Sequence, residues 1–352
     1  MQTAEGTLQT MRVSPIETAA DLHQLGALFC DAKVVLAAVE LRLFTEISQN
    51  PLTQEQVCDR CELNPRAVRD FLSVLVTLGL LEHEDGRYGN SPVAERFLNR
   101  RSEEYAGGFL ERANRMMYPV WEHLSSLLRT GDPQAKGRED QAAAFERMMA
   151  DPEHVKRFLD MMDALTDSLG PELARAPIPW DRYSTVVDIG GGRGNVLARV
   201  LDANPGLSGY VFDLPAVEHP FYEHVEKFGL LDRARFVGGD FFVDPLPVAD
   251  VLIIGHVLHD WSAEERRALI GKAYAAVADG GLLLIYDQLT GAGRVDDTWN
   301  SIISLNMQLL SPGGSEYSPA EAEEWLRKAG FAQVTITPLG AHDSLIIARK
   351  NG

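Results

Sequence analysis

The sequence predicts an α/β protein in which a doubly wound, Rossmann-like sheet follows an N-terminal domain of helices and a winged helix. Three observations support this fold class. In the second half of the 352-residue chain, short β-branched segments alternate with helical patterns. The first of these segments, 185–189, leads directly into a cluster of glycines. In the first half, two short helical patterns precede the dipeptide Asp85-Gly86, which is typical of a hairpin turn.

The composition indicates a two-domain protein with a negative charge. Thirty-three basic and fifty-one acidic residues give a net charge of −18, and 45% hydrophobic residues suffice for two cores. Such a charge repels nucleic-acid backbones and anionic membranes. The N-terminus has no basic region followed by an apolar one, and no uncharged apolar run reaches 18 residues. We therefore expect a cytoplasmic protein that binds neither nucleic acid nor a membrane.

Residues 21–47 have apolar side chains at helical spacing, which predicts buried helices with a break near Cys30-Asp31. The three cysteines, Cys30, Cys58 and Cys61, cannot all pair. A zinc ion would need two further ligands that the neighbouring sequence does not supply. We expect reduced structural thiols and no metal.

Residues 52–88 are predicted to form the winged helix. Thr53 is the expected N-cap of its first helix, with Gln56 in the capping-box position, and Pro65 opens the second helix. The hairpin would be the wing. This half alone also fits a DNA-binding regulator, a hypothesis from a different functional class.

The charges of the second helix weaken the regulator hypothesis. Arg66 and Arg69 are its only basic residues, and a solvated helix face explains them equally well. A regulator would bind duplex DNA in a strongly salt-dependent way.

Residues 102–175 are helical in pattern and are predicted to form a connector and the roof of a pocket. Breaks are expected at 130–133 and at Asp151-Pro152. The segment is rich in methionine and aromatic residues, which suit a flat ligand but also occur in ordinary cores. The expected domains are therefore 1–101, 102–175 and 176–352.

The third domain begins after a proline-rich boundary at 176–180 and alternates strands with helices. This alternation favours a mostly parallel sheet with an antiparallel edge, and ligands bind beyond the carboxyl ends of its strands. The expected strands are 185–189, 209–212, 234–237, 249–254, 281–287, 332–336 and 344–348.

The segment from Asp188 to Gly194 predicts a sharp turn from a strand into a helix whose N-terminus faces a nucleotide. Asp213, about 20 residues later at the end of the next strand, is suited to ribose hydroxyls. The glycine spacing disfavours NAD and leaves S-adenosylmethionine as the preferred nucleotide. Asp240 and Phe241, after a third strand, suit the amine and the ring face of an adenine.

Five segments together make this chain resemble the S-adenosylmethionine-dependent small-molecule O-methyltransferases, which include caffeic acid and hydroxyindole O-methyltransferases and bacterial antibiotic-biosynthesis enzymes. They occur in the family's order and cover nearly the whole chain. The segments are VVDIGGGRG, VFDLPAV, GGDFF, HVLHDWSAEE and LLSPGGSEYS.

The resemblance implies S-adenosylmethionine as cofactor, S-adenosylhomocysteine as product and a homodimer formed through the N-terminal domain. It also implies two sets of binding residues. For the cofactor these are Asp188, Gly190, Gly191, Gly192, Asp213, Leu214, Asp240, Phe241, Gly255 and Trp261. For the acceptor substrate they are Met116, Trp121, Met162, His256, Asn306 and Met307.

A base is useful in such a reaction because a phenol with a pKa of about 10 is mostly protonated at neutral pH. Histidine can accept that proton. His259 matches the family's catalytic histidine in the His-Asp-Trp triplet, which leaves His256 as a pocket or packing residue. Trp261 either lies against the adenine or packs at the start of the helix capped by Ser262.

The resemblance also implies two carboxylates that orient the histidine, Asp287 and Glu316. Asp287 stands where plant members commonly have a longer Glu. Another departure is Gly255, where many plant members have a cofactor-contacting lysine. Loss of this lysine suggests more room in the pocket.

The predicted activity is metal-independent O-methylation of a phenolic hydroxyl on an aromatic or polycyclic natural product, as in antibiotic biosynthesis and other secondary metabolism. One alternative is methylation of an aromatic ring carbon. Another is a cofactor-bound relative that transfers no methyl group, such as a hydroxylase or decarboxylase.

Overall fold

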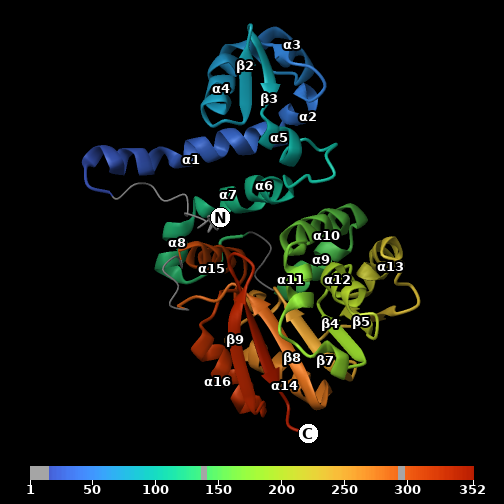
Figure 1. Ribbon diagram of the computed structural model, residues 1–352. Coiled ribbons are helices and arrows are strands. Elements are labelled where there is room, and N and C mark those ends of the chain that lie inside the picture. Colours follow the sequence, from blue (N-terminus) through green and yellow to red (C-terminus); the bar gives the residue numbers. More distant parts are fainter. Residues whose placement is uncertain (1–15, 136–140, 292–297) are drawn as a thin grey trace, which may run out of the picture. The chain divides into compact units, whose positions relative to one another are not determined.

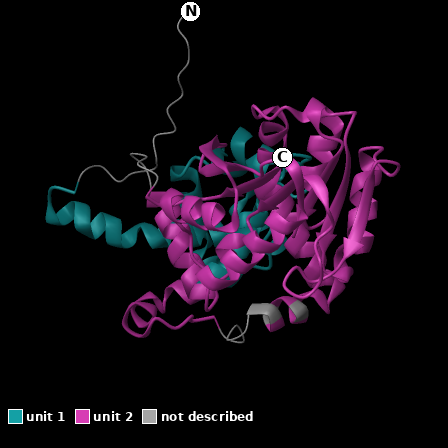
Figure 2. Cartoon of the chain, turned by 90° about the horizontal axis from the view of Figure 1, so that it is seen from below, with its two compact units in different colours: residues 1–119 teal, residues 120–352 magenta. Residues whose placement is uncertain are grey.

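The computed structural model describes residues 16–135, 141–291 and 298–352 (Figure 1). The chain divides into two compact units, residues 1–119 and 120–352, which Figure 2 colours separately. The predicted division at 101 and 175 stays a prediction. The helices of residues 152–175 belong to the second unit and contact α12, the helix after the glycine cluster.

Unit 1 opens with a long helix whose N-cap, Thr18, forms a capping box with Asp21. This helix continues through Cys30-Asp31, so the predicted break there is wrong. Both residues are exposed, so their side chains do not disturb the packing of the helix. The helix ends instead just before Arg42, which has a left-handed backbone (φ 56°). The helices of the unit are α1 (Ala19–Glu40), α2 (Leu43–Ile47), α3 (Gln54–Arg60), α4 (Pro65–Thr77), α5 (Pro92–Phe97) and α6 (Gly108–Arg112), followed by the π-helical turn η1 (Ala113–Met117).

Helix α1 is long and apolar enough, by length and composition alone, to cross a membrane, and among the described helices it alone meets that test. Its apolar side chains Leu22, Leu25, Leu28 and Phe29 are exposed. An exposed apolar stripe on a helix is typical of a surface that binds another protein chain.

The predicted cap and turn of the wing region are confirmed. Thr53 and Gln56 form a capping box at the start of α3. Asp85 and Gly86 both have positive φ, which is the geometry of a tight hairpin turn. The strands β1 (Leu52–Thr53), β2 (Leu81–Glu84) and β3 (Arg87–Asn90) form an antiparallel sheet in the order β1-β3-β2.

Both breaks predicted between the wing and the main sheet are confirmed, whereas further breaks at 122–123 and 167–168 were not predicted. Gly131 ends α8 in a left-handed conformation, and Asp151 caps α10 at Pro152. The helices are α7 (Tyr118–Trp121), α8 (Leu124–Thr130), α9 (Gln141–Met149), α10 (Pro152–Thr166) and α11 (Leu169–Arg175), and a single turn η2 (Trp180–Arg182) follows.

The main sheet of unit 2 has the order β6-β5-β4-β7-β8-β10-β9, parallel except for pairings of β10. The prediction of a mostly parallel, doubly wound sheet with an antiparallel edge is confirmed. Its strands are β4 (Thr185–Ile189), β5 (Ser208–Asp213), β6 (Ala234–Gly238), β7 (Ala249–Gly255), β8 (Val277–Asp287), β9 (Gln333–Leu339) and β10 (Asp343–Arg349). The remaining helices are α12 (Asn195–Ala203), α13 (Glu218–Lys227), α14 (Ala263–Ala276), α15 (Thr298–Leu310) and α16 (Pro319–Ala329), with turns η3 (Pro215–Val217) and η4 (Leu258–Asp260).

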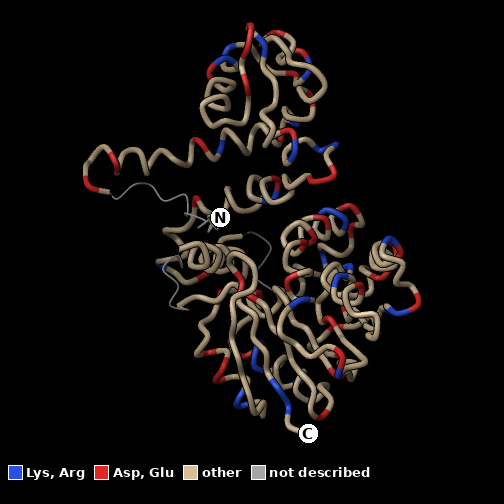
Figure 3. Tube along the Cα trace, viewed as in Figure 1, with Lys and Arg blue, Asp and Glu red and all other residues tan. Residues whose placement is uncertain are grey.

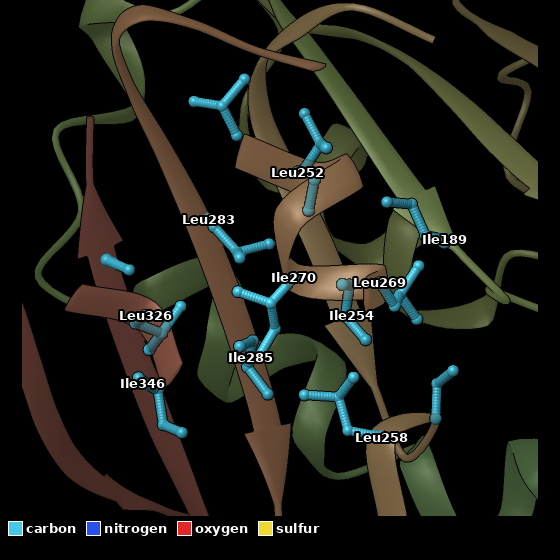
Figure 4. Close-up of a cluster of buried hydrophobic side chains, with 14 of the residues drawn as sticks. Ile189, Leu252, Ile254, Leu258, Leu269, Ile270, Leu283, Ile285, Leu326 and Ile346 are labelled. Atoms are coloured by element: carbon cyan, nitrogen blue, oxygen red, sulfur yellow. The ribbon is translucent and has the colours of Figure 1, made fainter. Parts of the chain in front are cut away.

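Both faces of this sheet are buried, as expected for a parallel sheet covered by helices. Alternate residues of one strand belong to different cores: Leu252 and Ile254 pack toward α14 and α16, and Val251 and Ile253 toward α11 to α13. Figure 4 shows the first of these cores. The two cores hold the strand ends of β4 to β8 in fixed positions, where the candidate site lies.

Candidate active site

The glycine-rich loop joins β4 to α12 at the carboxyl edge of the sheet. Gly192 has a positive φ (57°), and its amide donates to the Asp213 carboxylate at 2.8 Å. A Cβ on Gly191 would lie 2.6 Å from Cγ of the buried Asp188, so the loop can pass this side chain only as glycine. Burial, and then the charge of Asp213, raise the pKa of Asp188 to about 8.

Two carboxylates follow at the ends of β5 and β6. Asp213 also accepts from the amide of Leu214 at 2.7 Å; burial raises its pKa to about 6, although these two hydrogen bonds lower it. Oδ1 of Asp240 accepts from the amide of Phe242 at 2.7 Å. Both carboxylates are thus oriented by main-chain amides and can still accept hydrogen bonds from a ligand.

Trp261 lies in an aromatic cluster beside Asp240. Its ring centroid is 5.7 Å from that of Phe241 and 4.6 Å from that of Phe242, both edge to face, and 6.1 Å from Phe145. The next residue, Ser262, is the N-cap of α14, as predicted. The cluster gives the site a flat apolar wall.

A cavity with about 1180 Å³ of empty space, part of it open to solvent, joins these features. The cavity is lined by all ten residues predicted to bind the cofactor, and by Met162 and His256 from the predicted acceptor set.

The charge of this lining is strongly acidic. Among its described residues are five aspartates and one arginine, Arg193, which is already paired with Asp160 and Asp163. Asp188 is mostly neutral at pH 7 because its pKa is about 8, so the negative charge of the lining comes from the other aspartates. An acidic lining favours a cationic ligand and disfavours a pyrophosphate.

The space around Gly255 is more crowded than predicted. A Cβ at this position would lie 1.8 Å from Cζ of Tyr286, so the ring of Tyr286 occupies the space that a longer side chain would need. The expected extra room is therefore filled, and the expectation was wrong. Tyr286 itself lines the cavity.

The predicted catalytic residues His259, Asp287 and Glu316 lie together next to this cavity, outside its lining. Nδ1 of His259 lies 2.8 Å from Oε1 of Glu316 and 3.7 Å from Oδ1 of Asp287. Both carboxylate side chains are fully buried, whereas the His259 side chain is 14% exposed. The nitrogen engaged by the carboxylates is Nδ1, so Nε2 is the nitrogen that can face a ligand.

The shorter Asp287 makes its closest contact elsewhere. Its Oδ2 accepts from the hydroxyl of Tyr317 at 2.6 Å, which leaves Oδ1 near His259. Oδ1 of Asp287 and Oε2 of Glu316 are buried and accept no hydrogen bond from the described residues.

The ionisation of this cluster is shifted by burial and by the charges within it. Burial lowers the pKa of His259, but Glu316 and Asp287 outweigh this and raise it to about 10. Burial raises the pKa of Asp287 to about 7, against the opposing charge of His259. The cluster therefore holds at least one proton at neutral pH.

His256 forms a second buried pair. Its Nε2 lies 2.5 Å from Oδ1 of Asp343, at the start of β10, and its ring lies nearly parallel to that of His259 with 5.7 Å between centroids. The backbone of His256 has a positive φ (51°), a strained conformation for this residue. Burial lowers the pKa of His256, but the charge of Asp343 and its hydrogen bond raise it above the ordinary value.

The other predicted acceptor residues do not line the cavity. Nε1 of Trp121 donates to Oδ1 of Asn306 at 3.2 Å, which brings these two together. Met307 is buried, and Met116 is half-buried on the π-helical turn η1 of unit 1. A π-helical turn often marks a functional position.

Among the site residues that sequence reasoning missed are Tyr286 in the cavity lining, and Arg266, Tyr317 and Asp343 around the two histidines. Arg266 had a signal, since it shares the inward face of α14 with Leu269, Ile270 and Ala273, where a charge is unexpected. Tyr317 and Asp343 had none, because only the fold brings them to Asp287 and His256.

Comparison with known proteins decides the family. The O-methyltransferase domain matches residues 121–332, and the O-methyltransferase dimerisation domain matches residues 23–100. The chain belongs to the O-methyltransferase family. The resemblance predicted from five sequence segments is confirmed.

Two of the most similar curated relatives are methyltransferases from Streptomyces. The tetracenomycin polyketide synthesis 8-O-methyl transferase TcmO of Streptomyces glaucescens is 43% identical over 331 residues, 94% of this chain and 96% of the relative. The N,N-dimethyltransferase OxyT of Streptomyces rimosus is 37% identical over 325 residues, 92% of this chain and 94% of the relative. Both relatives are methyltransferases, and each aligns with more than nine tenths of this chain.

A solved structure identifies the cofactor. Human N-acetylserotonin methyltransferase in complex with S-adenosylmethionine matches with a TM-score of 0.84 and 26% identity over 96% of this chain and all of that one. S-Adenosylmethionine is the cofactor of the present enzyme. The cavity fits it: carboxylates suit the ribose and the adenine amine, aromatic rings suit the adenine, and the acidic lining suits a sulfonium cation.

Proposed function

We propose that this O-methyltransferase methylates a phenolic hydroxyl of an aromatic or polycyclic natural product, with His259 as general base and without a metal ion. The contact that carries the proposal is the 2.8 Å approach of Glu316 to Nδ1 of His259. It orients the imidazole with Nε2 directed away from the carboxylates, the arrangement of a base held by an acid.

The residues of the site have separate roles in the proposed reaction. When bound, S-adenosylmethionine supplies an electrophilic methyl group. Asp213 would bind the ribose, Asp240 the adenine amine, and Phe241 with Trp261 the adenine ring, while the loop glycines and Leu214 approach through their main chain. Nε2 of His259 would take the phenolic proton, and Glu316 and Asp287 would stabilise the resulting imidazolium.

On the acceptor side we propose Met162 and His256, which line the cavity, and the hydrogen-bonded pair Trp121 and Asn306. Met307 precedes the loop that carries Glu316 and would support it. Met116, on η1 of unit 1, stays a prediction from the resemblance.

His259, Asp287 and Glu316 also have the spacing of a metal site, because one ligand atom from each lies within 4.8 Å of the others. A divalent ion is the competing explanation for the buried carboxylate oxygens without donors. We favour a proton, since Nδ1 of His259 already bonds to Glu316 and Tyr317 already donates to Asp287.

The N-terminal unit would form a homodimer through the exposed apolar residues of α1, in line with its dimerisation domain. A role in DNA binding has less support. On α4, Arg69 is paired with the adjacent Asp70, and basic residues are interspersed with acidic ones along the chain (Figure 3).

The test is mass spectrometry of hydroxylated polycyclic aromatics incubated with enzyme and S-adenosylmethionine, with EDTA and, in parallel, with added Mg²⁺. We expect one methyl group on oxygen at the same rate in both. A strict need for Mg²⁺ would contradict the metal-free proposal. Methyl on a ring carbon, or on nitrogen as the name of OxyT suggests, would change the acceptor atom. A hydroxylated or decarboxylated product would place the enzyme with its non-methylating relatives.

A further inference from the structure

Arg266 is a buried charge whose role the proposed reaction does not explain. It lies in the first turns of α14, is 3% exposed, and faces the core together with Leu269 and Ile270. Burying a guanidinium costs free energy unless its donors are satisfied and its charge is offset. Its contacts therefore indicate what it does.

The guanidinium bonds to two separate loops. Nε donates to the carbonyl of Leu258 at 2.8 Å, and Nη2 donates to the carbonyl of Ser315 at 2.6 Å and to its Oγ at 3.0 Å. Nη2 also lies 3.5 Å from the carbonyl of His259, which accepts from the amide of Ser315 at 2.9 Å. Arg266 thus fastens the loop of His259 to the loop of Glu316.

The acceptors of Arg266 are uncharged. In residues 16–135, 141–291 and 298–352 it forms no ion pair, and its guanidinium lies over the rings of Tyr317 and Trp325, 5.1 and 5.8 Å from their centroids. Its positive charge therefore acts on the nearby buried anions, Asp287 and Glu316.

The total charge of the cluster explains why a buried cation is useful beside it. While His259 is a neutral base, Asp287 and Glu316 would together carry two negative charges in a buried site. One fixed positive charge nearby reduces the affinity of the whole cluster for protons. A lysine could supply the charge but not the planar fork that spans two loops.

We propose that Arg266 is a positioning residue that joins the loops of His259 and Glu316 and, as a fixed positive charge, lets His259 lose its proton while both carboxylates stay ionised. This inference rests on the proposed function of His259 as the base. It extends that function to a residue which contacts neither substrate nor cofactor.

The groups that face His259 from each neighbouring element are few. They are Glu316 and Tyr317 from the loop before α16, Asp287 from β8, Asp260 from its own turn, and His256 with Asp343 behind it from β7 and β10; Arg266 and Glu321 lie farther out. Of these, Arg266 alone is a permanent cation.

The experiment compares Arg266→Met, Arg266→Lys and the control Arg267→Met, which changes the exposed neighbour on the same helix. Two quantities are measured between pH 6 and pH 11: kcat, and the titration of the His259 ring by NMR of the protein labelled at histidine Cε1. The His259 signal is assigned by its loss in His259→Asn. Cofactor affinity and thermal midpoint are controls for folding.

For Arg266→Met we expect the midpoint of the kcat profile and the final titration step of His259 to move up by roughly one pH unit, because the imidazolium loses a nearby like charge that disfavours its protonated form. At neutral pH, kcat should fall about tenfold and recover at high pH, with the KM for S-adenosylmethionine unchanged. Arg266→Lys should keep the midpoint and lower kcat at every pH. Arg267→Met should match wild type.

An unmoved midpoint in Arg266→Met, with kcat lowered equally at all pH values, would overturn the electrostatic role. If that variant does not fold, a midpoint displaced in Arg266→Lys would overturn it instead. The NMR titration needs no methyl acceptor, so it still tests Arg266 if no phenol is methylated and the proposed function fails.

Discussion

The cofactor side and the acid–base side of this site lie at the same edge of one sheet but are held together differently. Around the glycine-rich loop, main-chain amides orient the carboxylates, as in the bonds from Gly192 and Leu214 to Asp213. Around His259, buried side chains orient one another, with Glu316, Asp287 and Tyr317 in a chain of contacts. Binding on the first side should therefore tolerate changes that stop the reaction on the second.

The largest effect should come from His259→Ala. A positioned general base contributes roughly 10²- to 10⁴-fold to a rate, so kcat should fall by about that factor. Affinity for S-adenosylmethionine, measured by calorimetry, should stay within about twofold, because His259 does not line the cavity. If His259→Ala lowered cofactor affinity and kcat by the same factor, cofactor binding and acid–base chemistry would not be separable in this site.

On the cofactor side, Asp213→Ala should weaken binding of S-adenosylmethionine about tenfold or more, since a hydrogen bond to a charged group is worth about 1.5–3 kcal/mol. The loop amide of Gly192 also loses its acceptor. The matched control is Asp202→Ala, an exposed residue of α12. An unchanged dissociation constant would argue against recognition of the ribose by this carboxylate.

Tyr317→Phe tests the side-chain network through stability. It removes the donor to Oδ2 of Asp287, which is fully buried. A buried acceptor left without its partner costs about 1–3 kcal/mol, so the free energy of unfolding in urea should fall by that amount. Tyr183→Phe should change the free energy of unfolding little, because the Tyr183 hydroxyl forms no hydrogen bond with the described residues. If Tyr317→Phe and the wild type had equal free energies of unfolding, the hydrogen bond from Tyr317 to Asp287 would not contribute to stability.

Gly255→Ala tests the close packing at the wall of the cavity. The new methyl group would meet Cζ of Tyr286 at 1.8 Å, and the forced shift should cost about 1–3 kcal/mol of stability. Gly271→Ala in α14, where a Cβ meets nothing within 4 Å, should instead stabilise the protein by about 0.5–1 kcal/mol. Thermal unfolding of both variants tests whether the ring of Tyr286 is the reason that only glycine fits at position 255.

The cofactor side and the acid–base side also differ in how much of them could be predicted from the sequence. Asp188, the glycines and Asp213 are close in sequence, and strand alternation alone locates them at one edge. The acid–base side is assembled from distant segments: Asp343 reaches His256 across 87 positions, and Trp121 reaches Asn306 across 185. No local pattern contains such contacts, and only the resemblance to a family led to Asp287 and Glu316.

The break predicted near Cys30-Asp31 failed for a related reason. The apolar spacing is interrupted there, but an exposed position tolerates polar residues without ending a helix. The actual end depends on the left-handed backbone of Arg42, which has no signature in its residue type.

The most direct measurement is the pH profile of kcat for wild type and His259→Ala at saturating S-adenosylmethionine and phenol. Glu316 and Asp287 raise the pKa of His259 to about 10, so the ring is protonated at neutral pH and must lose that proton to act as the base. We expect the wild-type rate to rise about tenfold per pH unit from neutral pH toward this value, well above the residual rate of the variant, which reports the ionisation of the phenol alone. Profiles that coincide, or a wild-type rate independent of pH, would contradict His259 as the base.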